Sequence, residues 1–153
     1  MLIKSIKKAP DFKLDSTSSK PFELNKIKNS LVVYFYPKDN TPGCTLETRD
    51  FSKLYKKFKN LKCEVVGISK DNIKSHLGFK KKYKVPFQLL SDEKIQVQKK
   101  YGIWGKKSFM GKKFMGTIRS TVVINKGKIL NIWSNVRVKN HAQEVLDYIK
   151  SKK

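Results

Sequence analysis

The chain has 153 residues, of which 39% are hydrophobic, enough for one core but not for two ordinary domains, so we expect a single domain over residues 1–153. Charged residues make up 31%, and the eight glycines and five prolines are spread along the chain, so wholesale disorder is excluded. The formal net charge is +23, but only three of the 35 basic residues are arginines, which favours a solvated lysine surface over a specific nucleic-acid interface.

The first half of the chain predicts a strand, a helix and a second strand. Residues 31–36 form an apolar β-branched and aromatic run typical of a buried strand. After a turn rich in proline and glycine, apolar residues at positions 51, 54, 55 and 58 indicate an amphipathic helix that ends near residue 60. Residues 63–69 form a second buried strand, and a right-handed crossover places the two strands parallel in one sheet.

The second half predicts three helices, a short strand and a hairpin. We expect helices over residues 72–83, 92–101 and 142–149, and a short strand over residues 87–90. Residues 120–124 and 128–133 flank Asn125-Lys126-Gly127, a tight turn that pairs the two strands antiparallel. Together these elements predict an α/β protein with a thioredoxin-like fold, a central mixed β-sheet flanked by helices.

Two cysteines, Cys44 and Cys63, are too few for a disulfide scaffold. The first ten residues carry positive charge but no apolar stretch and no small-residue cleavage site, so we expect no secretory signal and a cytoplasmic location. The longest apolar run is far shorter than the roughly 20 residues of a membrane span, so we expect a soluble protein without membrane partners.

Cys44 is the candidate nucleophile. Thr41 is suited to the N-cap of the first helix and Pro42 to its first position, which makes Cys44 the third helical residue. Its sulfur then lies beside unpaired N–H groups at the positive end of the helix dipole, a setting that stabilises a thiolate. Thr41 stands where a Cys-x-x-Cys motif would have its first cysteine, so dithiol exchange as a thioredoxin-type reductase is disfavoured. A hydroxyl, a thiolate and N–H donors together fit an oxygen-rich substrate.

The chain resembles the peroxiredoxins, specifically the bacterioferritin comigratory protein or peroxiredoxin Q subfamily. The resemblance rests on Pro37, Thr41 and Cys44 at Pro-x-x-x-Thr-x-x-Cys spacing and on a downstream Arg119. It is reinforced along nearly the whole chain by Ala9-Pro10-Asp11-Phe12, Gly67-Ile68-Ser69, Tyr101-Gly102-Ile103-Trp104-Gly105, Ser108-Phe109-Met110-Gly111-Lys112, Arg119-Ser120-Thr121 and Lys139-Asn140-His141-Ala142.

The resemblance implies a thiol-dependent peroxidase for hydrogen peroxide and organic hydroperoxides. Cys44 would attack the peroxide and become a sulfenic acid, and Arg119 would stabilise the thiolate and the leaving oxygen. Thr41 would contribute its hydroxyl and Pro37 would shield the thiolate. The N–H groups of Gly43 and Cys44 would complete the substrate cradle. Glu47 would orient the arginine, although an ordinary acid in the first turn of a helix is an equally good interpretation.

The chain departs from the subfamily in its second cysteine. The positions that carry a resolving cysteine in relatives correspond here to Arg49 and approximately Lys80. Cys63 would lie roughly 20 Å from Cys44 at the far end of a helix, whereas a disulfide needs Cα atoms within about 7 Å. We therefore expect Cys63 to be a structural residue and an external thiol to reduce Cys44; a two-cysteine cycle through Cys63 is the alternative.

Thioredoxin, or glutaredoxin with glutathione, is the expected reductant, and the resemblance favours a monomer. We expect no cofactor and no metal, because His76 and His141 lack partners at metal-ligand spacing. Residues 104–115 are aromatic, basic and rich in methionine, and we interpret them as a locally packed loop near the mouth of the site. The rival function from another class is a basic, nucleic-acid-associated redox sensor.

Overall fold

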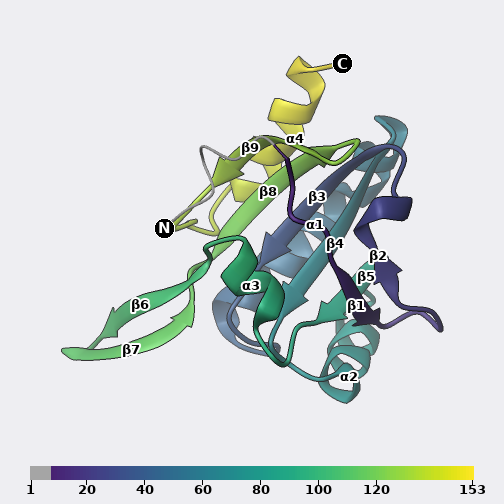
Figure 1. Ribbon diagram of the computed structural model, residues 1–153. Coiled ribbons are helices and arrows are strands. Elements are labelled where there is room, and N and C mark those ends of the chain that lie inside the picture. The colour runs from purple at the N-terminus through teal and green to yellow at the C-terminus, as the bar shows by residue number, and fades with distance from the viewer. Residues whose placement is uncertain (1–7) are drawn as a thin grey trace.

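The computed structural model describes residues 8–153 and consists of one mixed sheet, a separate two-stranded hairpin and four α-helices (Figure 1). The expectation of no secretory signal rests mainly on residues 1–7, which lie outside the described residues. The elements in chain order are β1 (Lys13–Ser16), β2 (Phe22–Glu23), the 3-10 helix η1 (Leu24–Lys26), β3 (Ser30–Phe35), α1 (Pro42–Asn60), β4 (Cys63–Ser69), α2 (Ile73–Tyr83), β5 (Gln88–Ser91), α3 (Gln96–Lys100), β6 (Trp104–Phe109), β7 (Lys112–Thr117), β8 (Ser120–Asn125), β9 (Lys128–Trp133) and α4 (His141–Ser151).

The main sheet has seven strands in the order β2-β1-β5-β4-β3-β8-β9. The three central strands β3, β4 and β5 are parallel, while β1 and β8 are antiparallel to their neighbours. The parallel pairing of β3 with β4 and the antiparallel pairing of β8 with β9 confirm the two predicted strand pairs. The carboxyl end of β3 leads into the turn that precedes α1, so the sheet fixes where α1 begins.

Both faces of the sheet are covered, which explains why β3 is apolar from Leu31 to Phe35. Val32 and Tyr34 face a core that includes residues of α1, α2 and α4, whereas Leu31, Val33 and Phe35 face a core closed by α3 and the N-terminal segments. All six residues of β3 are buried. The buried strand β3 therefore leads into the turn that precedes the candidate nucleophile, which lies in the first turn of α1.

The structure corrects three expectations. The predicted helix over residues 92–101 is only α3, because the Asp92 carboxylate accepts the Val97 and Gln98 N–H groups from outside the helix, with Ile95 in the left-handed region. The strands β1 and β2, which extend the sheet beyond β5, were not predicted, since they are short and largely polar.

The third correction concerns residues 104–115, which do not form a locally packed loop. They form most of β6 and β7, a hairpin that is separate from the main sheet and projects from the body (Figure 1). Across residues 8–153, no helix combines the length and apolar character needed to cross a membrane.

Candidate active site

The N-terminus of α1 presents Cys44 as the sequence predicts. Thr41 is the N-cap with extended backbone (φ −86°, ψ 153°), and Pro42 is the first helical residue, so Cys44 is the third. The first N–H groups of a helix have no acceptor within the helix, which leaves those of Gly43 and Cys44 available to a ligand. Cys44 itself is only 1% exposed. The sulfur thus lies in a shielded position at the positive end of a 19-residue helix.

Arg119 reaches this sulfur from a different part of the chain. It lies between β7 and β8, and its Nη2 donates to Cys44 Sγ at 3.3 Å while Nη1 donates to Glu47 Oε1 at 2.6 Å. Gly43 allows this approach, because a β-carbon at that position would lie 3.2 Å from Arg119 Nη2. One guanidinium therefore joins the sulfur and the carboxylate, which are one helical turn apart.

Glu47 is buried, with 1% of its side chain exposed. Burial raises its pKa to about 7, and the Arg119 guanidinium only partly opposes that shift. Burial alone would lower the pKa of Arg119, but the negative charges of Glu47 and Cys44 outweigh it and raise that pKa. Glu47 Oε1 accepts from Arg119, which is the contact that the interpretation of Glu47 as an orienting residue requires.

Thr41 and Pro37 lie in the turn before the helix. The Thr41 hydroxyl donates to the Lys38 carbonyl at 2.9 Å, and it makes no capping bond to the helix. With its proton engaged, this hydroxyl offers a lone pair and is therefore suited to accept a hydrogen bond from a peroxide O–H. Pro37 is half-buried at the start of the turn.

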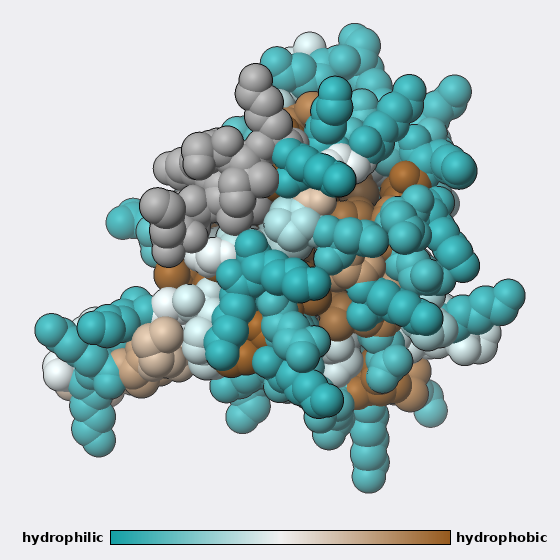
Figure 2. All heavy atoms as spheres, in the orientation of Figure 1, coloured by the Kyte–Doolittle hydropathy of each residue, from teal (hydrophilic) through white to brown (hydrophobic). Residues whose placement is uncertain are grey.

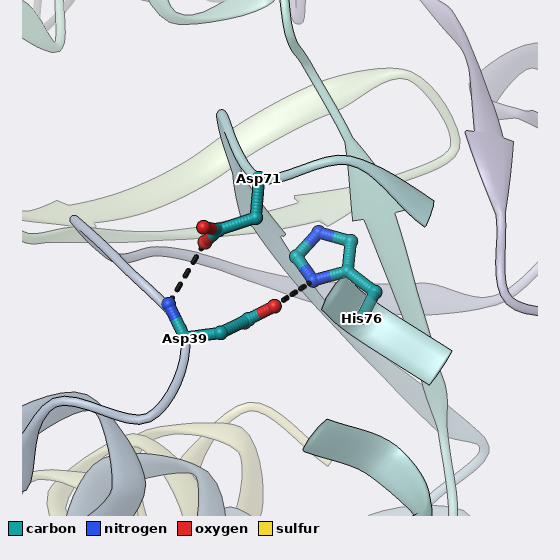
Figure 3. Close-up of side chains that lie close together, drawn as sticks. All are labelled: Asp39, Asp71 and His76. Atoms are coloured by element: carbon teal, nitrogen blue, oxygen red, sulfur yellow. Dashed lines mark hydrogen bonds and ion pairs between the residues drawn. The ribbon is translucent and has the colours of Figure 1, made fainter. Parts of the chain in front are cut away.

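A buried polar cluster beside the turn was missed by the sequence analysis. The cluster consists of Asp39 in the turn, Asp71 after β4 and His76 in α2 (Figure 3). One side-chain oxygen or nitrogen atom from each of them lies within 4.8 Å of the other two. The Asp39 N–H donates to Asp71 Oδ2 at 2.8 Å, and the hydroxyls of Tyr36 and Ser75 donate to the Asp39 carboxylate at 2.7 and 2.8 Å. We interpret the cluster as a hydrogen-bond network that ties the turn to α2.

His76 is fully buried in this network, and both of its ring nitrogens face acceptors. Nδ1 lies 2.7 Å from Asp39 Oδ2, and Nε2 lies 2.9 Å from the Leu90 carbonyl oxygen. These two contacts hold the imidazole between the turn and β5.

We expect His76→Ala to lower the free energy of unfolding by about 3–5 kcal/mol, because it removes the buried imidazole that lies 2.7 Å from the Asp39 carboxyl group. The measurement is urea unfolding of the wild type, His76→Ala, Asp39→Ala and the double variant. The double variant should lose less than the sum of the single losses, by about 0.5–3 kcal/mol. Additive losses would show that the two side chains do not act as a pair.

Cys63 lies at the start of β4, remote along the chain from the N-terminus of α1. Both cysteines are free thiols. The stretch of α1 from Cys44 to Asn60 corresponds to roughly 24 Å of helix, since each residue rises about 1.5 Å. Burial raises the pKa of Cys63 to about 12. At neutral pH this thiol is therefore protonated and shielded from solvent.

The chain matches a family model described as the AhpC/TSA family over residues 6–132. Peroxiredoxin Bcp of Bacillus subtilis is 38% identical over 152 residues, which cover 98% of this chain and 97% of the relative. The chloroplastic peroxiredoxin Q of Sedum lineare is 40% identical over 149 residues, which cover 94% of this chain and 76% of the relative.

Solved structures agree with the sequence matches. Peroxiredoxin Q of Xanthomonas campestris has a TM-score of 0.87 at 34% identity, with 92% of this chain and 90% of that chain covered. The bacterioferritin comigratory protein of Xanthomonas campestris, described through its alkyl peroxide reduction activity, has a TM-score of 0.87 at 33% identity over 92% of this chain and 91% of that chain. These matches confirm the thioredoxin-like fold and the predicted resemblance.

Proposed function

This chain belongs to the AhpC/TSA family and is a peroxiredoxin, an enzyme that reduces peroxides with thiol reductants, and from this premise we propose that Cys44 is the peroxidatic residue of a single-cysteine cycle. The observation that carries the proposal is the Arg119 guanidinium, which donates to Cys44 Sγ at 3.3 Å and to Glu47 Oε1 at 2.6 Å at the N-terminus of α1. In the proposed cycle this positive charge and the free N–H donors stabilise the thiolate form of Cys44.

In the first step the Cys44 thiolate attacks the distal oxygen of a hydroperoxide ROOH. The S–O bond forms as the O–O bond breaks, which gives the sulfenic acid and an alkoxide RO⁻ that takes a proton to become ROH. Arg119 and the N–H groups of Gly43 and Cys44 are placed to stabilise the charge that develops on the oxygens. Thr41 is suited to accept the hydrogen bond of the peroxide O–H, and Pro37 to limit access of water to the sulfur.

The substrate class follows from the same arrangement. In the proposed mechanism the sulfur, the guanidinium, the N–H groups and the hydroxyl interact with the two peroxide oxygens and not with the rest of the substrate. Hydrogen peroxide and alkyl hydroperoxides therefore both fit. The alkyl peroxide reduction activity described for the Xanthomonas campestris relative supports the second class.

We infer that an external thiol, and not Cys63, reduces the sulfenic acid. The pKa of the Cys63 thiol is raised to about 12 by burial, so it supplies almost no thiolate at neutral pH. The other two places where relatives carry a resolving cysteine hold basic residues. Arg49 is exposed on α1, and the Lys80 ammonium donates to the carbonyls of Val85 and Phe87 at 2.8 and 2.6 Å. Such a thiol-dependent cycle fits a reducing compartment such as the cytoplasm.

We expect Cys63→Ser to keep peroxide turnover within about twofold of the wild type, because the proposed cycle does not use this thiol and free buried cysteine acts mainly as a small apolar residue. Steady-state peroxide consumption with thioredoxin, with glutathione plus glutaredoxin, and with dithiothreitol measures this. Intact mass after one equivalent of peroxide should show one added oxygen. A stoichiometric internal disulfide in the wild type, with loss of recycling in Cys63→Ser, would establish the two-cysteine cycle instead.

A further inference from the structure

The β6–β7 hairpin, which we call the arm (Trp104–Thr117), is not part of the main sheet. Its two strands pair in register from Trp104 opposite Thr117 to Phe109 opposite Lys112, and it extends outward from the body of the molecule (Figure 1). An isolated two-stranded hairpin is only marginally stable in water. The chain therefore maintains a projecting element whose role is not to complete the core.

The arm exposes large apolar side chains. Phe109, Met110, Phe114 and Met115 are 68%, 87%, 47% and 50% exposed. Figure 2 shows apolar surface on the projecting element bordered by hydrophilic side chains. Exposed apolar groups gathered on one element mark sites of protein interaction.

The turn at the tip of the arm adds to this argument. Met110 and Gly111 form the two-residue connection, with φ of 51° and 81°. Such turns favour asparagine or aspartate followed by glycine, because the first residue is left-handed. A methionine at this position does not favour the turn. Because 87% of it is exposed, burial does not stabilise it either. Its flexible apolar side chain is instead suited to a contact surface that adapts to a partner.

The charge of the arm restricts the partner. The segment from Gly102 to Arg119 contains four lysines and no aspartate or glutamate. Lys107 is opposite Phe114 and Lys112 is opposite Phe109, so each of the two phenylalanines is paired across the hairpin with a lysine on the same face. A complementary surface combines acidic and apolar side chains.

The base of the arm adjoins the candidate active site. A groove of about 420 Å³ is lined by Lys106, Lys107 and Ser108 of β6 together with Arg119 and Val136. Arg119 is the residue that donates to Cys44 Sγ. Burial, and then the neighbouring Arg119 charge, lower the pKa of Lys107, which agrees with its place beside the guanidinium. A molecule bound along the arm and in this groove is thus next to the guanidinium that contacts Cys44 Sγ.

We propose that the arm is the docking surface for a protein thiol reductant whose reactive cysteine is surrounded by acidic and apolar side chains. The inference rests on the proposed single-cysteine cycle. A hydroperoxide is too small to need this surface, whereas a protein that delivers a thiol to a buried sulfur needs an oriented contact. The reductant thiolate attacks the Cys44 sulfenic sulfur and, with one proton, releases water and forms a mixed disulfide. Its second thiol then forms the reductant's own disulfide and releases the Cys44 thiolate.

The test compares Phe109→Ser/Phe114→Ser with the matched control Leu77→Ser/Leu130→Ser, whose leucines are 48% and 42% exposed outside the arm. The reductants are thioredoxin, glutaredoxin with glutathione, and dithiothreitol. We expect the KM for the active protein reductant to rise about tenfold or more in the arm variant only, as for the loss of interface hot spots. The dithiothreitol-driven rate and the peroxide step should stay within about twofold of wild type, since a small thiol needs no docking surface.

Four outcomes would overturn the inference. The first is an unchanged KM for the protein reductant in the arm variant, and the second is an equal loss of rate in that variant with dithiothreitol. The third is a wild type that turns over with dithiothreitol but with neither protein reductant. The fourth is arm-dependent binding to anionic vesicles, or arm-dependent dimer formation, without an effect on KM. Failure of the proposed function looks different, because the wild type would then consume no peroxide even with dithiothreitol. Charge reversal by Lys112→Glu/Lys113→Glu should likewise raise the KM and weaken its dependence on salt.

Discussion

Cys44→Ser should reduce thiol-dependent peroxide consumption to the uncatalysed background, the largest effect we expect from any single substitution. A serine hydroxyl is almost entirely protonated at neutral pH, and it has no oxidised state equivalent to a sulfenic acid that a thiol could reduce. The serine side chain is close in size to cysteine, so the buried position next to Arg119 stays filled. The measurement is steady-state consumption of hydrogen peroxide with dithiothreitol, together with circular dichroism to verify folding.

Cys63→Ser is the matched control, because it makes the same chemical change at another buried position, with 1% exposure at both sites. Turnover by folded Cys44→Ser above the background would remove Cys44 from its role. Loss of turnover in both variants would mean that both sulfurs take part, and it would require α1 to unfold or two chains to cooperate.

The core strands and helices were predictable because their residues are uniform in character. The run at 31–36 is apolar at every position, and β3 occupies Ser30–Phe35. Cys63–Ser69 coincides with the predicted strand, and α1 ends at Asn60 as expected. The arm was not predictable as a projecting hairpin. Its aromatic and methionine residues have the composition of a buried segment, and only the tertiary structure shows that no partner within the described residues covers them.

The site was predictable only in part. The position of Cys44 follows from local rules for helix N-termini, but its contact with Arg119, 75 residues away, depends on how β8 lies beside β3. The cluster of Asp39 and His76 was not predicted, because the two residues are far apart in the sequence and match no metal-binding or catalytic motif. One signal was present, since His76 and Phe79 share the buried face of α2, and a histidine at a buried helical position requires polar partners.

Arg119→Ala should slow the reaction of Cys44 with hydrogen peroxide by about 10²–10³, the usual effect of removing one preorganised donor from an anionic transition state. Two interactions disappear together, the 3.3 Å bond to Cys44 Sγ and the 2.6 Å bond to Glu47. The measurement is the second-order rate constant of peroxide reduction by stopped flow, alongside ultraviolet thiolate absorbance as a function of pH. Thiolate absorbance that matches the wild type across the titration, with an unchanged rate constant, would exclude Arg119 from the mechanism.

Arg119→Lys and Glu47→Gln separate charge from geometry in this prediction. A lysine keeps the positive charge but not the planar fork that reaches two partners, so it should recover only part of the rate. Burial raises the pKa of Glu47 to about 7, so folding favours its neutral form. The free energy that this costs the folded state grows as the pH rises from about 4.5 to about 7 and is constant above that range. Glu47→Gln removes this ionisation. The stability of this variant relative to the wild type should therefore improve with increasing pH through that range. Its peroxide rate should fall less than that of Arg119→Ala, because the neutral amide still accepts a hydrogen bond from Arg119 but holds it less firmly. A stability difference that does not change with pH would mean that Glu47 is ionised throughout and acts as a permanent counter-ion to Arg119.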